Sequence, residues 1–142
     1  MGNDWVEISH EALDVGRATA FVADAAAGGI AVFIGTSRAE TDASGRALLA
    51  LDYEVYEAMA MVQLRDLAVR ARARWPLVKL ALLHRCGRVG LAEPSVVIAV
   101  STPHRAEAFE ACRWLIDTLK SEVAVWKKEV WSDGTTTWVD PR

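Results

Sequence analysis

The sequence has 142 residues, of which 52% are hydrophobic, and its formal net charge is −3. This size and composition are typical of a folded chain with its own core, and we expect a single domain over residues 1–142. The weak negative charge disfavours nonspecific nucleic-acid binding, and no apolar run or basic N-terminal segment predicts a membrane span or a secretory signal.

The first predicted elements are a strand, a helix and a second strand. Residues 5–8 alternate between apolar and polar side chains, which predicts a strand, and Ser9 is then a candidate N-cap for a helix over residues 11–25. The apolar run at residues 30–34 predicts a buried, central strand. Residues 39–45 are small and polar, so we expect a mobile loop there.

A strand, a long helix and two further strands follow. Residues 46–54 predict a strand, and residues 55–74 predict a helix with arginines towards its C-terminal end. The helix should end at Trp75, because a residue that precedes proline avoids the helical conformation. Apolar runs at residues 79–84 and 95–100 predict two buried strands joined by a glycine-containing turn.

The last third of the chain predicts a helix followed by a hairpin. Thr102 is a candidate N-cap and Pro103 a candidate first helical residue for a helix that continues to about Ser121. Residues 124–131 and 135–139 read as extended segments joined by an Asp-Gly turn signal. Interleaved strands and helices with hairpin returns predict an α+β fold.

Five basic residues are candidates for an anion-binding site. His104 and Arg105 lie at a predicted helix start, where cations are normally disfavoured, and a broken local rule of this kind favours a functional role. Arg38 follows a predicted strand and a glycine, where a guanidinium can bind phosphate or carboxylate. Lys120 and Lys127 border an apolar segment, where a partly desolvated lysine can clamp an anion, carry a proton or act as a nucleophile. Solvated surface positions are the alternative for the two lysines and for His104 and Arg105.

The remaining reactive residue types predict no further chemistry. Cys86 and Cys112 lack the spacing of metal ligands, and we expect both to be core thiols in a reducing cytoplasm. We expect His84 to be a strand-end residue satisfied by hydrogen bonds. The sequence contains no phosphate-binding loop, dinucleotide fingerprint or zinc-protease motif, so we expect neither a cofactor nor a metal.

Five segments of the chain, taken together and in order, resemble the large, catalytic subunit of molybdopterin synthase. The segments cover most of residues 30–129. They are VFIGTSR (32–38), LDYEVYEAMA (51–60), ARWPLVKLALLHRCG (73–87), VVIAVSTPHRAEAFEA (96–111) and DTLKSEVAVWKKE (117–129).

The resemblance implies an α+β fold of the α/β-hammerhead type with additional antiparallel strands. It implies a sulfurtransferase of molybdenum cofactor biosynthesis, which converts cyclic pyranopterin monophosphate into molybdopterin. The sulfur arrives as a thiocarboxylate on the C-terminal Gly-Gly of a small ubiquitin-like partner. The large subunit of this family is a homodimer that binds a partner at each end, which gives a heterotetramer.

The resemblance also implies roles for the five basic residues. Lys120 and Lys127 match the essential lysines of the family and are expected to be catalytic and to bind substrate. Arg38, His104 and Arg105 match basic pocket residues that are expected to hold the substrate phosphate and the pterin. The alternative is a non-catalytic, anion-binding scaffold for a ubiquitin-like partner.

The sequence departs from the family pattern at several positions. Pro103 stands where a small residue such as alanine is common, and Ala124 stands where proline is common. The loop at residues 39–45 lacks an asparagine that often follows the arginine. Near the C-terminus, Trp138 and Arg142 are candidates to complete the pocket across a dimer interface.

Overall fold

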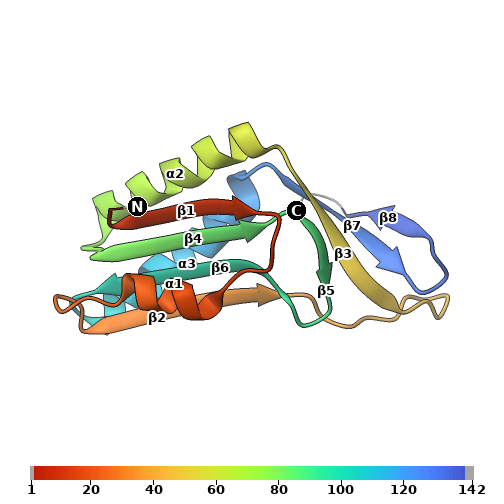
Figure 1. The fold of residues 1–142 in the computed structure, drawn as a ribbon, viewed down its shortest axis with the longest axis horizontal. Coiled ribbons are helices and arrows are strands. Elements are labelled where there is room, and N and C mark those ends of the chain that lie inside the picture. The colour runs from red at the N-terminus through yellow and green to blue at the C-terminus, as the bar shows by residue number, and fades with distance from the viewer. Residues whose placement is uncertain (1, 140–142) are drawn as a thin grey trace.

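The computed structural model describes residues 2–139 and contains three helices and eight strands within them (Figure 1). Their bounds, in chain order, are β1 Asp4–Ser9, α1 Val15–Val22, β2 Gly29–Thr36, β3 Leu48–Val55, α2 Glu57–Arg74, β4 Lys79–Arg85, β5 Gly87–Gly90, β6 Pro94–Thr102, α3 Arg105–Glu122, β7 Val125–Trp131 and β8 Thr136–Trp138. None of these helices is long and apolar enough to cross a membrane. The predicted α+β class is confirmed.

The first sheet has the strand order β1-β4-β6-β2, in which β1 and β4 are parallel and the other pairs are antiparallel. Helices α2 and α3 pack on one face and α1 packs on the other (Figure 1). β4 and β6 are apolar along most of their length because both of their faces are covered. Leu82 lies in the cluster with α2 and α3, for example, and Leu83 lies in the cluster with α1.

β2 is an edge strand of this sheet, so the prediction of a central strand is wrong. Ala31 and Phe33 pack into the core beneath α3. Ile30, Val32 and Ile34 point to the opposite face and are 36–47% exposed. The apolar run correctly indicates that both faces of β2 carry apolar side chains. The run does not indicate which strands pair with β2 or which helices cover its faces, because these neighbours are set by the tertiary structure.

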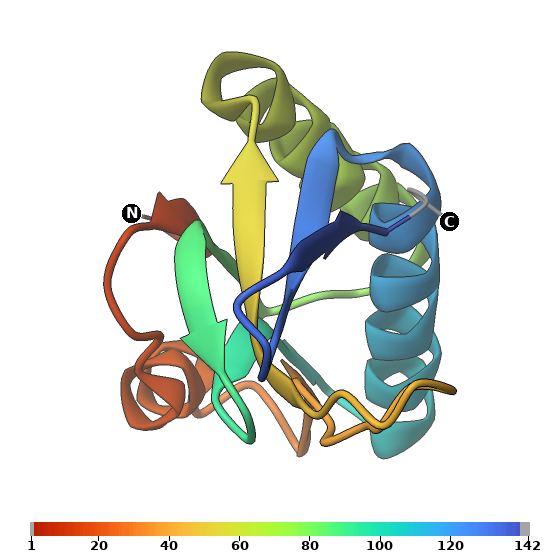
Figure 2. The same cartoon turned by 90° about the vertical axis from the view of Figure 1, so that its right-hand side faces the viewer.

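The second sheet has the order β5-β3-β7-β8, is antiparallel throughout, and lies at the other end of the molecule beside the end of α3 (Figures 1 and 2). β3 pairs with β5 along one edge and with β7 along the other. The predicted hairpin of β7 and β8 is confirmed. Residues 87–90, for which the sequence predicts a turn, form the short strand β5.

Two helices begin later than the sequence predicts. Asp14, and not Ser9, is the N-cap of α1, because its carboxylate accepts a 3.0 Å hydrogen bond from a backbone amide of the first turn. Ser9 is instead the last residue of β1. Helix α3 begins at Arg105 with His104 as its N-cap, because β6 continues as far as Thr102.

Candidate active site

An open pocket of about 830 Å³ lies where the end of the first sheet meets the second sheet and α3. The segment after β2, strands β3 and β7 and the last turns of α3 supply its walls. The apolar part of the wall includes Leu48, Leu51, Val96, Ile116, Leu119 and Val123. A pocket with an apolar wall and a few polar groups is the usual form of a small-molecule site.

Three of the five predicted basic residues line this pocket. Arg38 follows the end of β2, and Lys120 lies in the last turn of α3. Lys127 lies on β7, where it pairs in register with Tyr53 of β3. None of the three cations forms an ion pair with another of residues 2–139. An incoming anion therefore meets these cations without displacing a carboxylate from them.

Three carboxylates also line the pocket, from Glu40, Asp117 and Glu129. Asp117 lies 3.5 Å from the guanidinium of Arg113 on the surface of α3. Glu129 accepts a 3.2 Å hydrogen bond from the hydroxyl of Thr137. The pocket thus carries both signs of charge, which suits a ligand that presents anionic groups together with hydrogen-bond donors.

The alternation of side chains along β7 separates Lys127 from its neighbour. Lys128 points to the opposite face of the sheet, where its Nζ lies 5.2 Å from the ring centroid of Trp138. Trp138 is not among the residues that line the pocket of its own chain. Arg142, the other candidate near the C-terminus, lies outside the described residues.

His104 and Arg105 do not reach this pocket within one chain. They lie at the start of α3, whereas Lys120 lies in its last turn. Arg105 and Lys120 are fifteen residues apart in the same helix, which corresponds to about 22 Å along its axis. The start of α3 packs instead against the start of β2, where a Cβ atom added to Gly29 would lie 2.9 Å from the Cα of Arg105.

The pocket also contains uncharged polar residues that were not predicted as functional, among them His84, Tyr53 and Ser37. The Nδ1 of His84 lies 2.8 Å from the carbonyl oxygen of Arg85, which confirms the expected strand-end hydrogen bond and leaves Nε2 as the acceptor nitrogen. Burial lowers the pKa of His84 and raises the pKa of Tyr53, so both groups are held uncharged. The Ser37 hydroxyl is buried without a hydrogen-bond partner among residues 2–139.

The two cysteines differ in their surroundings, and both are free thiols. Cys112 lies in the core between α3 and the first sheet, and burial raises its pKa to about 11, as expected of an inert core thiol. Cys86 lies between β4 and β5 and is only partly buried, so the prediction of a core position is wrong for this residue. A turn between two strands leaves one side of its residues open to solvent.

Comparisons with known proteins agree on one family. The family model described as MoaE protein matches residues 8–122. The molybdopterin synthase catalytic subunit of Culex quinquefasciatus is 44% identical over 94% of this chain and 85% of its own length. The molybdopterin synthase catalytic subunit of Nostoc sp. is 40% identical over 96% of this chain and 82% of its own length. The crystal structure of molybdopterin synthase from Staphylococcus aureus superposes with a TM-score of 0.88 at 31% identity and covers 94% of this chain and 96% of that chain.

Proposed function

The chain belongs to the MoaE protein family, and we propose from this premise that its pocket is where sulfur is added to a phosphorylated pterin. The expected family and the expected enzyme class, a sulfurtransferase of molybdenum cofactor biosynthesis, are confirmed by the family match and by relatives named as molybdopterin synthase catalytic subunits. The proposed reaction converts cyclic pyranopterin monophosphate into molybdopterin.

The observation that carries the proposal is the convergence of Arg38, Lys120 and Lys127 on one pocket. A pterin phosphate brings negative charge, which cations without carboxylate partners can bind. Its ring brings apolar faces and amine donors, for which the pocket offers an apolar wall and three carboxylates. The pocket therefore offers a complementary group for each chemical part of this substrate.

The sulfur donor is proposed to be the C-terminal thiocarboxylate of a small ubiquitin-like partner, as the resemblance to the family implies. The relatives are named as catalytic subunits, which supports the presence of a further subunit. A Gly-Gly tail has no side chains and can extend into the pocket beside a bound substrate. We assign Lys120 to the thiocarboxylate carbonyl and Lys127 to charge stabilisation or proton transfer as oxygen is replaced by sulfur. Cytoplasm is the proposed compartment, because free thiols at Cys86 and Cys112 suit reducing conditions.

A homodimer is proposed as the working form, and it would give His104 and Arg105 a role. Antiparallel pairing of two β2 edges about a twofold axis would satisfy the unpaired backbone groups of this edge strand and bring the exposed side chains of Ile30, Val32 and Ile34 of the two copies side by side. The start of β2 in one copy would then lie beside the end of β2 in the other. The start of α3 packs on the start of β2, so His104 and Arg105 of one copy would approach the pocket of the other.

The test of the proposed reaction is conversion of the cyclic precursor in vitro with a thiocarboxylated partner. Lys120→Ala and Lys127→Ala should each lower the rate by about 10²–10³-fold, the usual effect of removing a group that stabilises developing charge. Lys128→Ala is the matched control, because Lys128 lies on the same strand and faces away from the pocket. Near-normal sulfur transfer by Lys120→Ala would refute the role assigned to Lys120.

The second candidate function is a non-catalytic scaffold that binds a ubiquitin-like partner and an anion. The charges of the pocket fit a scaffold as well as an enzyme, and the precursor-conversion assay distinguishes the two functions. A scaffold would bind the thiocarboxylated partner and form no molybdopterin, in the wild type as well as in the lysine variants.

A further inference from the structure

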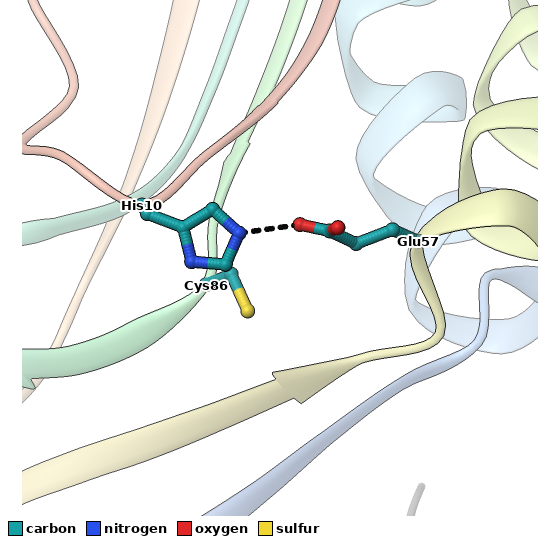
Figure 3. Close-up of side chains that lie close together, drawn as sticks. All are labelled: His10, Glu57 and Cys86. Carbon is teal, nitrogen blue, oxygen red and sulfur yellow. Dashed lines mark hydrogen bonds and ion pairs between the residues drawn. The ribbon is translucent and has the colours of Figure 1, made fainter.

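Three potential metal ligands meet on the surface outside the pocket: His10, Glu57 and Cys86 (Figure 3). Their ligand atoms all lie within 4.8 Å of one another. The Nε2 of His10 lies 2.6 Å from a carboxylate oxygen of Glu57, and Cys86 lies beside the imidazole ring. We propose that these three side chains bind a divalent transition metal, with Zn²⁺ as the best match.

Backbone contacts hold the three ligands in place. His10 directly follows β1, and the backbone amide of Cys86 donates a 2.8 Å hydrogen bond to the carbonyl of Ser9. The thiol of Cys86 lies 3.7 Å from the carbonyl oxygen of Tyr53. Glu57 is the first residue of α2, so the start of this helix fixes the position from which its side chain extends. Three elements distant in sequence thus present their side chains to one point.

The donor set selects the class of metal. A thiolate with an imidazole and a carboxylate suits Zn²⁺ or Co²⁺, whereas Mg²⁺ and Ca²⁺ prefer oxygen ligands alone. Tetrahedral Zn²⁺ with these ligands places their donor atoms about 3.5 Å apart. The existing separations need only small rotations of exposed side chains to reach that spacing, since the side chains of His10 and Glu57 are 68% and 50% exposed.

The exposure of the cluster also determines whether the metal has a coordination position that is open to solvent. Three protein ligands leave one position of a tetrahedral metal open, and solvent reaches this side of the cluster. A water molecule would complete the coordination. The bound metal would tie the segment after β1 to the start of α2 and to the turn between β4 and β5. This inference stands on its own and does not depend on the proposed sulfur-transfer reaction.

Metal titration of the full chain tests the proposal. The protein is stripped with a chelator, kept reduced with a non-thiol reductant, and titrated with Zn²⁺ by calorimetry and with Co²⁺ by absorption spectroscopy. We expect one metal per chain and a thiolate-to-Co²⁺ charge-transfer band, with no detectable binding of Mg²⁺. Failure of the wild type to bind Zn²⁺, or one metal shared by two chains, would overturn the proposal.

Variants identify the ligands. Cys86→Ser, His10→Gln and Glu57→Gln should each weaken Zn²⁺ binding by at least about tenfold, and Cys86→Ser should remove the charge-transfer band. Glu11→Gln and His104→Gln are the matched controls, because both residues are exposed and lie outside the cluster, and they should leave the affinity unchanged. Unchanged Zn²⁺ affinity in both Cys86→Ser and His10→Gln would overturn the assignment. If Cys86→Ser does not fold, His10→Gln alone decides, because His10 is exposed and its replacement keeps the fold.

Discussion

His84 links the stability of the protein to pH at the scale of a single residue. Burial holds its pKa below the ordinary imidazole value of 6.5, so the unfolded chain takes up a proton at His84 more readily than the folded chain does. The contribution of neutral His84 to the free energy of unfolding is therefore complete above pH 6.5 and is lost as the pH falls from there through the folded-state pKa. Urea denaturation from about pH 7.5 to about pH 5.5 should show this loss.

One histidine variant separates His84 from other titrating groups. His84→Gln should flatten the dependence of the urea midpoint on pH, because no buried imidazole remains to be protonated. A slope that survives in His84→Gln would assign the pH dependence to a different residue.

At the scale of an element, two variants test which residue is the N-cap of α1. Asp14→Ala removes the side-chain acceptor for a first-turn amide and should lower the free energy of unfolding by about 1 kcal/mol. Ser9→Ala should cost less, because its hydroxyl contacts only the exposed backbone of Glu11. Urea denaturation at neutral pH measures both. A larger loss for Ser9→Ala than for Asp14→Ala would place the N-cap at Ser9 after all.

The sequence predicted the types of the elements better than their limits and neighbours. Period and composition identify β4, β6, α2 and α3, because helices and strands impose their own spacing on apolar residues. The N-cap of α1 was misplaced because Ser9 and Asp14 are both good capping residues and only the end of β1 decides between them. The edge position of β2 escaped prediction because pairing partners are a property of the whole sheet.

At the scale of the whole molecule, the sequence predicted the candidate site in part. Arg38, Lys120 and Lys127 do meet in one pocket, because β7 turns back from the end of α3 to pair with β3. His104 and Arg105 lie at the opposite end of α3, a separation that follows from helix length. No sequence motif predicts the proposed metal cluster. Its three ligands follow β1, begin α2 and follow β4, and only the tertiary structure brings them together.

Mixed dimers test whether one copy completes the pocket of the other. If Arg105 acts across a dimer, a dimer of one Lys120→Ala copy and one Arg105→Ala copy contains one pocket with neither substitution and one pocket with both. Random association of equal amounts should then restore about a quarter of the wild-type precursor conversion, although each variant alone is nearly inactive. If Arg105 served the pocket of its own chain, every pocket in the mixture would carry one substitution, and conversion would stay at the level of the parent variants. Val32→Lys, introduced into both variants, should abolish this recovery of conversion, because a charge on the exposed face of β2 opposes pairing of the two edges.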